Sequence, residues 1–213
     1  MAKFINGANG TFSGKVGSVI GASWRGIHYL RGLAKKSKVP ATEAQSAQRL
    51  RFRLVTKFLS PLQGILSAGF RNVRRLTAAQ FSMAVKRNIE QAVIGAAPDF
   101  EIDYPAITLS EGSLFIPLTS SLAVAEGTVT VTWDPAPSQF GGASNDVAYI
   151  VVCNAERQLF ITTELPATRA EGTAVVDVPV PFAGQVGHAW MFFASPNGKK
   201  VSNTVYLGEV TFQ

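Results

Sequence analysis

The sequence predicts an α+β protein in which a basic, glycine-rich region with three short helices precedes an all-β domain. Three observations lead to this prediction. Residues 1–90 contain 16 Lys or Arg and two acidic residues, a net charge of +14, whereas residues 91–213 contain four and 12, a net charge of −8. Helix-start patterns recur between residues 42 and 94, and later apolar residues alternate with the two-residue period of strands. We therefore expect two domains, residues 1–96 and 97–213.

The glycine-rich arm, residues 1–40, is expected to contain a β-hairpin. Two β-prone pieces, Val16–Ile20 and Ile27–Leu30, flank Ser23–Gly26, where a glycine suits a tight turn. A two-stranded hairpin is marginally stable by itself in water, so the arm should need a partner. That partner is either the rest of this chain or another copy. The arm ends in a basic linker closed by Pro40, which disfavours helix before it.

Three helices are predicted at about 42–59, 61–73 and 77–94. Each predicted start has a capping box, in which a Ser or Thr is followed three residues later by a Gln. The three boxes are Thr42–Gln45, Ser60–Gln63 and Thr77–Gln80. The first helix has an expected core-facing row of Leu50, Leu54 and Phe58. A basic row lies about 100° round the same helix and consists of Arg49, Arg53 and Lys57.

The remaining chain predicts short antiparallel strands. They are expected at about 105–109, 113–118, 127–133, 146–153, 158–163, 172–179, 186–194 and 203–211. Within 127–133, Val129, Val131 and Trp133 fall on one face and the threonines on the other. Seven or more strands at this spacing, separated by Pro and Gly clusters, indicate a β-sandwich.

Three segments resemble strands of fibronectin-III-like and immunoglobulin-like domains. Val129–Pro135 resembles the tryptophan-bearing second strand, Ala148–Val152 the third and His188–Ala194 the sixth. The resemblance covers about residues 100–213. It implies a fold and leaves the function open.

The whole chain also resembles an uncharacterised family of about 210 residues that is found mainly in Bacteroidota. The motifs that carry this resemblance are Phe12–Gly17, Ser23–Gly26, Thr42–Gln45, Gln48–Phe52 and Glu101–Tyr104. The family implies no established activity. The basic N-terminal pattern is also similar to segments of phage or particle-like structural proteins.

The sequence predicts no catalytic site, metal, cofactor or small-molecule substrate. The single cysteine, Cys153, lies in an apolar run and is expected to be buried. His28 and His188 have apolar neighbours and are expected to be structural. Gly10–Val16 has one residue too few for a phosphate-binding P-loop, and Val16 replaces its Ser or Thr. We also expect no signal peptide and no membrane span, and hence a cytoplasmic or particle-associated protein.

The functional signal is the basic and aromatic composition of the N-terminal half. The candidate interaction surface consists of Trp24, Arg25, Tyr29, Lys35, Lys36, Lys38, Arg49, Arg51, Arg53 and Lys57. The favoured hypothesis is a structural, virion or particle component that forms homo-oligomers or binds a protein partner. The alternative is nucleic-acid binding, in which cations meet phosphates and the aromatic rings stack on bases. The sequence leaves both open.

Overall fold

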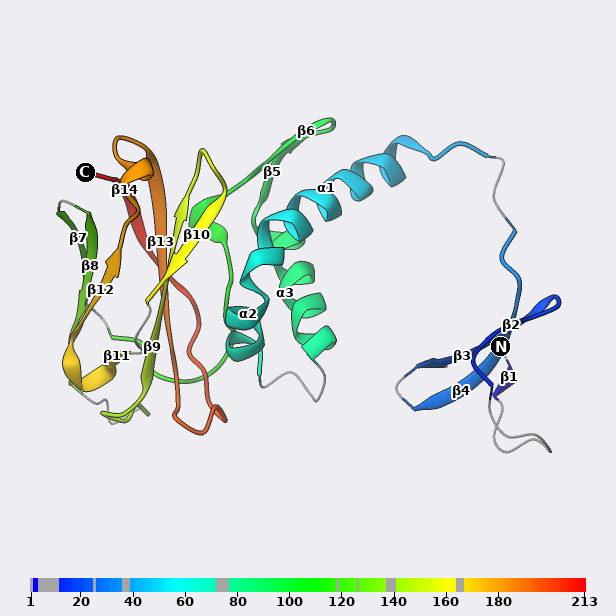
Figure 1. Cartoon of the computed structure of the whole chain (residues 1–213), viewed down its shortest axis with the longest axis horizontal. Coiled ribbons are helices and arrows are strands. Elements are labelled where there is room, and N and C mark those ends of the chain that lie inside the picture. The colour runs from blue at the N-terminus through cyan, green and yellow to red at the C-terminus, as the bar shows by residue number, and fades with distance from the viewer. Residues whose placement is uncertain are drawn as a thin grey trace. The chain divides into compact units, whose positions relative to one another are not determined.

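A computed structural model describes most of the 213-residue chain (Figure 1). The described residues are 2–3, 12–24, 26–35, 39–71, 77–117, 119–125, 127–136, 141–163 and 167–213. The chain divides into two compact units, Met1–Thr42 and Glu43–Gln213. This boundary differs from the one expected between residues 96 and 97, because the helices share a hydrophobic core with the β-sheet that follows them.

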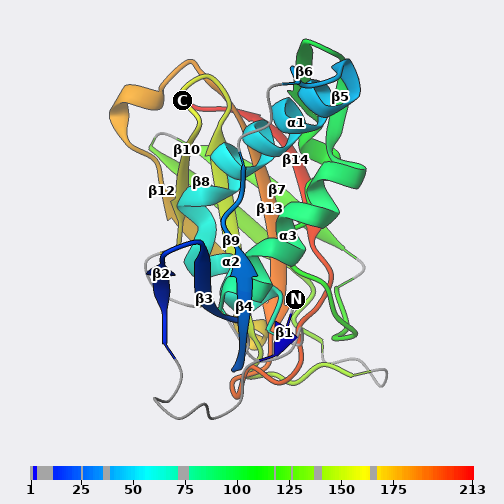
Figure 2. The same ribbon diagram turned by 90° about the vertical axis from the view of Figure 1, so that its right-hand side faces the viewer.

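The N-terminal unit is a four-stranded antiparallel sheet, of which Figure 2 shows β2, β3 and β4 as neighbouring arrows. Its strands are β1 (Ala2–Lys3), β2 (Gly14–Val16), β3 (Val19–Trp24) and β4 (Ile27–Gly32), in the order β1-β4-β3-β2. The expected hairpin is present as β3 and β4. The expected single strand at 16–20 is instead interrupted by a turn, since Gly17 adopts a φ of +59° that favours glycine.

The helices of the C-terminal unit are α1 (Glu43–Leu59), α2 (Gln63–Gly69) and α3 (Thr77–Gln91). A 3₁₀ turn, η1 (Ser60–Leu62), separates the first two, so Ser60 does not cap α2 as its capping box predicted. Helix α2 ends at Gly69, before the expected residue 73. Gly69 lies so close to the chain at Leu109 that an added Cβ would be 2.1 Å from the Leu109 carbonyl oxygen.

Helix α3 ends before the expected residue 94, and a short hairpin follows it. The hairpin consists of β5 (Val93–Ala96) and β6 (Asp99–Ile102). The strands expected at 105–109 and 113–118 are wrong: the first region begins with a 3₁₀ turn, η2 (Tyr104–Ala106), and in the second Leu114 forms an isolated bridge to Ser202.

Two antiparallel sheets complete the C-terminal unit. The larger has the order β10 (Leu159–Thr162), β9 (Val147–Asn154), β13 (Val186–Ala194) and β14 (Val205–Thr211), with β11 (Ala167–Thr168) also paired to β9. The smaller has the order β12 (Thr173–Asp177), β8 (Thr128–Trp133) and β7 (Ser120–Ala125). Two further 3₁₀ turns are η3 (Arg169–Glu171) and η4 (Val180–Phe182).

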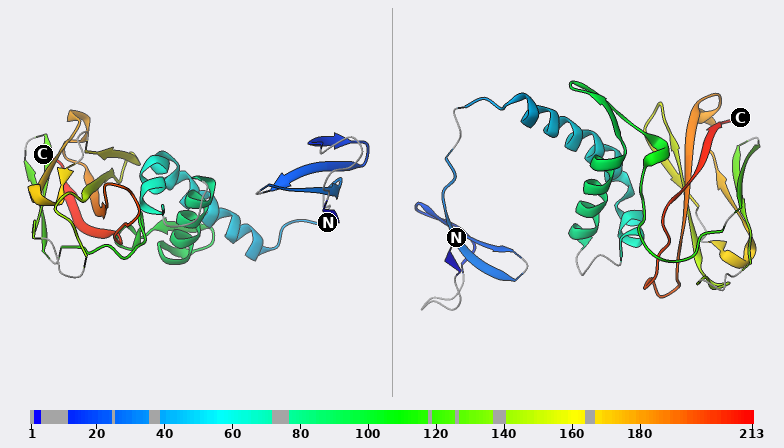
Figure 3. Two further views of the ribbon diagram at one scale, coloured as in Figure 1. Left: turned by 90° about the horizontal axis from the view of Figure 1, so that it is seen from below. Right: turned by 180° about the vertical axis from the view of Figure 1, so that it is seen from behind.

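The five-stranded sheet lies between the helices and the three-stranded sheet, as Figures 1 and 3 show. Alternate residues of β9 and β13 enter different cores. Cys153 and Trp190 pack with the helices, whereas Val152 and Phe193 pack with the three-stranded sheet. Burial on both faces explains why these strands are continuous apolar runs. The fold is therefore mixed α and β, and mostly antiparallel β. No helix in the described part of the chain combines the length and apolar character needed to cross a membrane.

Candidate interaction surface

The strand register of the N-terminal sheet separates its side chains onto two different faces. Cross-strand partners lie on the same side of an antiparallel sheet, and alternate residues lie on opposite sides. One face, here called the basic face, carries Lys15, Ile20, Ala22, Trp24, Ile27, Tyr29 and Arg31. The other, the uncharged face, carries Val16, Val19, Ser23, His28, Leu30 and glycines 14, 21 and 32. Charge is thus confined to one side of the described strands β2–β4.

The basic face is ordered along its length. Lys15, Ile20 and Arg31 form one cross-strand row, and Trp24 and Ile27 form a row at the opposite end. Trp24 is 60% exposed and Ile27 is 44% exposed. Within β2–β4, one end of the face is therefore cationic and the other is apolar.

The uncharged face is shaped by a glycine. A Cβ added at Gly21 would lie 2.3 Å from the carbonyl oxygen of Phe12 and 2.8 Å from its ring. Only glycine therefore allows the chain at Phe12 to lie against β3. Val16 is nonetheless 62% exposed. Among the described residues of Met1–Thr42 there is a single sheet and no second layer.

The two units differ sharply in charge. Residues 1–42 contain seven Lys or Arg and no Asp or Glu, so all 14 acidic residues of the chain belong to residues 43–213. The second unit has 13 Lys or Arg and is close to neutral. The net charge of +14 predicted for residues 1–90 is therefore divided equally between the N-terminal unit and residues 43–90 of the other unit.

The structure divides the predicted interaction surface between the two units. Trp24 and Tyr29 share the basic face, and Lys35 is exposed just beyond β4. Arg25, Lys36 and Lys38 lie outside the described residues. The remaining four predicted residues, Arg49, Arg51, Arg53 and Lys57, belong to α1 in the other unit. Lys15 and Arg31 belong to the basic face and were not among the predicted residues.

Helix α1 differs from its predicted pattern. Leu50 is 37% exposed and therefore does not belong to the core, whereas Val55 and Leu59 are fully buried beside Phe58. The guanidinium of Arg51 lies 4.6 Å from the ring centre of Phe100 in the β5–β6 hairpin. Arg51 therefore packs within its own unit, while Arg49, Arg53 and Lys57 are exposed.

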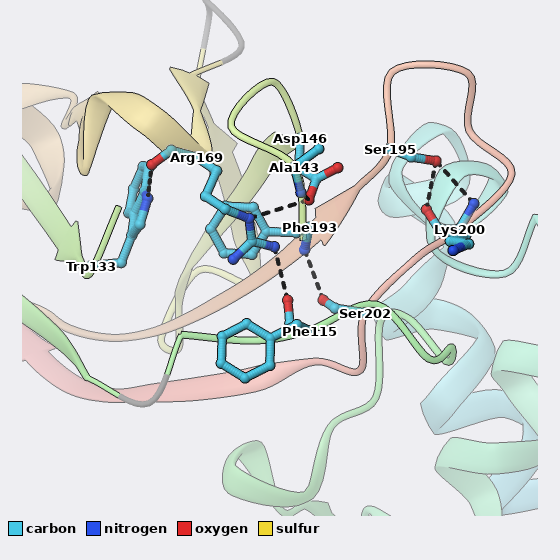
Figure 4. Close-up of polar contacts among 9 residues, drawn as sticks. All are labelled: Phe115, Trp133, Ala143, Asp146, Arg169, Phe193, Ser195, Lys200 and Ser202. Atoms are coloured by element: carbon cyan, nitrogen blue, oxygen red, sulfur yellow. Dashed lines mark hydrogen bonds and ion pairs between the residues drawn. The ribbon is translucent and has the colours of Figure 1, made fainter. Parts of the chain in front are cut away.

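The C-terminal unit contains a buried ion pair that the sequence did not predict (Figure 4). Nε of Arg169 lies 3.2 Å from a carboxylate oxygen of Asp146, and both side chains are almost fully buried. Arg169 also donates to the Phe115 carbonyl and lies 4.1 Å over the ring of Phe193. The same carboxylate oxygen accepts the Ala143 backbone N–H. These bonds join three loops and indicate a structural role.

A cleft of about 530 Å³ lies beside this pair, between the 141–146 loop and the turn that follows β13. Lys199 and Lys200 line it and are exposed. The Asp146 carboxylate at the cleft already accepts hydrogen bonds from Arg169 and from a backbone N–H. Among the described residues there is no group of three or more His, Cys, Asp or Glu side chains able to hold a metal ion.

The structure brings Cys153 and His188 together as cross-strand neighbours on β9 and β13. Burial raises the pKa of the Cys153 thiol to about 12, so the nucleophilic thiolate is suppressed. The His188 ring stacks on Tyr104 at 3.9 Å, and its Nδ1 lies 2.8 Å from the Tyr206 hydroxyl. Burial lowers the pKa of His188, against an opposing effect of Glu209. This arrangement stabilises the fold and does not resemble an activated Cys–His pair.

The fold and surface together define a mixed, mostly antiparallel β protein, in which the described part of the N-terminal unit is a basic four-stranded sheet. The chain belongs to a family of unknown function, DUF6266, whose pattern matches residues 11–208. The match includes parts of both units. No curated protein matches the chain.

Proposed function

We propose that this protein is a non-enzymatic structural or assembly protein that self-associates or docks onto a larger particle, such as a phage-like or appendage-like one. The observation that carries the proposal is the N-terminal sheet, in which Trp24, Ile27 and Val16 are exposed and over which the described residues of this unit place no second layer. A second layer ordinarily buries such side chains, and exposed apolar patches often mark interaction sites. The C-terminal unit has its own cores and supplies a folded body. A cytoplasmic or particle-associated location is part of the proposal.

The body itself is proposed to be a fibronectin-III-like or immunoglobulin-like sandwich in a Bacteroidota protein. Strand order supports the sandwich. Counted from β7 and leaving out the two-residue β11, strands β8, β9 and β13 are second, third and sixth, as the resemblance implies. The ring of Trp133 meets Phe193 edge-on at 5.6 Å, and its indole N–H donates to the Arg169 carbonyl at 2.9 Å. An experimental structure compared with fibronectin domains would test this part.

Light scattering coupled to size exclusion tests the assembly function. The full chain should form oligomers whose mass rises with concentration. Trp24→Ser with Ile27→Ser should reduce that mass by removing apolar contact area. Leu159→Ser is the matched control, because Leu159 is 51% exposed on β10 of the other unit and should leave the mass unchanged. A monomer at every concentration, with no sedimentation on particles from the source cells, would contradict the proposal.

Nucleic-acid binding is the second candidate, and one observation favours it. Lys15 and Arg31 share a sheet face with Trp24 and Tyr29, so cations and stacking rings point the same way. A fluorescein-labelled 20-nucleotide oligo-dT would report binding by anisotropy. The affinity should fall steeply between about 50 and 200 mM salt, because bound phosphates release counterions. Absence of binding at 50 mM salt would eliminate this candidate.

A further inference from the structure

We propose that the basic face of one copy docks on the outer face of the three-stranded sheet of a second copy. The inference rests on the proposed function, because it names the partner of the N-terminal sheet. The outer face is defined as the side of β7, β8 and β12 that faces away from the five-stranded sheet. Val129, Val131 and Val176 occupy the opposite, core-facing side.

The outer face carries short side chains and is nearly uncharged. The register gives three cross-strand rows, which are Asp177–Thr128–Ala125, Val175–Thr130–Ala123 and Thr173–Thr132–Ser121. Val175 is 53% exposed in the middle row, on the edge strand β12. Asp177, at one end, is the only charged residue in these rows. A sheet face with short side chains allows another sheet to approach closely.

The rows of the basic face match these rows in spacing and in character. Successive rows on one face of a sheet lie two residues apart, roughly 7 Å. When the row of Lys15 and Arg31 is placed over the Asp177 row, the row of Ala22 and Tyr29 falls over Val175. The row of Trp24 and Ile27 then falls over the hydroxyl row, where short Thr and Ser side chains leave room for an indole ring.

Charge and apolar content favour a second copy over a nucleic acid. Phosphates would meet the two cations at one end of the face but would leave Ile20 and Ile27 exposed to water. The outer face offers an acidic group to the cations and neutral, partly apolar atoms to the remainder. Residues 1–42 also lack any acidic residue, so the complementary charge lies in the other unit.

This contact joins the basic face of one copy to the outer face of another. In a pair of copies, one basic face and one outer face therefore remain unoccupied. Contacts of this kind are heterologous and can add copies head to tail until the chain of subunits closes or grows into a filament. The outer face and the basic face would thus make each copy both donor and acceptor. Oligomers should accordingly extend beyond dimers as the concentration rises.

A charge swap followed by sedimentation velocity at 50 mM NaCl tests the contact. Lys15→Glu with Arg31→Glu places like charges beside Asp177 and should weaken association by about ten-fold or more. Asp177→Arg should weaken it similarly. The triple variant restores opposite charges and should recover most of the wild-type association. Arg49→Glu with Arg53→Glu is the matched control, since it changes the net charge equally on exposed positions of α1.

The outcomes separate this contact from the broader function. A wild-type chain that oligomerises, combined with a triple variant that does not recover, would overturn the second-copy contact and leave assembly standing. A wild-type chain that stays monomeric would overturn both. Loss of oligo-dT binding in the Lys15→Glu, Arg31→Glu variant with unchanged self-association would assign the basic face to nucleic acid. Circular dichroism confirms that each variant is folded.

Discussion

The N-terminal sheet and the five-stranded sheet are both antiparallel, but their side chains are buried to very different extents. In the five-stranded sheet, Val151, Val152 and Phe193 are fully buried, because helices pack on one face and the three-stranded sheet packs on the other. In the N-terminal sheet, Trp24 and Val16 are more than half exposed on opposite faces. The same secondary structure therefore provides a core in one unit and an available surface in the other.

The sequences of the two sheets differ in charge and in glycine content, as expected from their difference in burial. Strands β9 and β13 are mostly apolar and lack Lys and Arg, whereas β2–β4 contain two cations and three glycines within 15 strand residues. A strand covered on both faces has no place for a solvated charge. Charge within a short strand is thus evidence that at least one face lacks a covering layer.

The largest expected difference between the two sheets is in thiol reactivity. Cys153 should react with DTNB at pH 8 only after unfolding, because it is fully buried and its pKa is raised to about 12. In the double variant Ser23→Cys, Cys153→Ser, the only thiol lies at an exposed position of β3. It should react roughly 10³-fold faster or more, because Cys153 reacts only in the unfolded fraction of molecules, which is about 10⁻³ or less. Labelling followed by absorbance measures both rates. Comparable rates would contradict the difference in cover.

The next largest effect is expected on removal of a large side chain. Phe193→Ala should lower the free energy of unfolding of the C-terminal unit by about 3–5 kcal/mol, because it leaves a cavity between Arg169 and Trp133. Trp24→Ala is the control and should change it by less than about 0.5 kcal/mol, as expected for an exposed position. Urea titration by circular dichroism measures both. Equal losses would mean that the N-terminal sheet is covered as well.

Removing one charge from the buried ion pair should have a somewhat smaller effect. Asp146→Asn leaves the Arg169 guanidinium buried without a counter-charge and should cost about 3 kcal/mol of unfolding free energy. The exposed pair of Arg87 and Glu111 offers a comparison, and Glu111→Gln should cost less because water replaces the lost partner. The same urea titration serves for both variants. An Asp146→Asn protein as stable as wild type would show that the pair does not hold the loops together.

Much of the body could be predicted because its signals are periodic. Strand β13 has the expected bounds of 186 and 194, and α1 begins and ends within a residue of its prediction. The hairpin of β5 and β6 could not be predicted, since Val93 continued the apolar pattern of the preceding helix. The pairing of Arg169 with Asp146 was also inaccessible, because the residues are 23 positions apart and only tertiary packing buries both.

The interaction surface was predictable in part. Trp24 and Tyr29 were chosen for their rings, and the structure places both on the basic face. Lys15 and Arg31 were missed because each is an isolated cation in sequence, and the turns at Gly17 and Gly26 bring them into one row. Helix α1 was included because linear charge does not reveal a unit boundary. The sequence does hold a signal for this face. If Gly17 and Gly26 are taken as turns, every second residue counted away from each turn lies on the same side of the sheet, and this places Lys15 and Arg31 together.

His188 lies on β13, on the face that the helices cover, yet 8% of it remains exposed. Its ring faces Tyr104 from η2 and Tyr206 and Glu209 from β14, with Cys153 alongside on β9. Burial lowers the pKa of His188 below its ordinary value of 6.5, and the nearby Glu209 carboxylate only partly opposes this. Burial raises the pKa of the neighbouring Tyr206 hydroxyl, and the Glu209 and Asp103 carboxylates add to this effect. The imidazole is therefore harder to protonate in the folded chain than in the unfolded chain.

This histidine gives the smallest effect that we expect, a dependence of stability on pH. The unfolded chain takes up a proton on His188 near pH 6.5, whereas the folded chain does so only at lower pH. The unfolded state thus binds more protons in that window, so stability should fall as the pH drops from 7 through 6.5 and onward. In His188→Gln, urea midpoints between pH 7.5 and 5.5 should vary less than in wild type. If both proteins lost the same stability over this range, the cover on this face of β13 would be too thin to desolvate the ring.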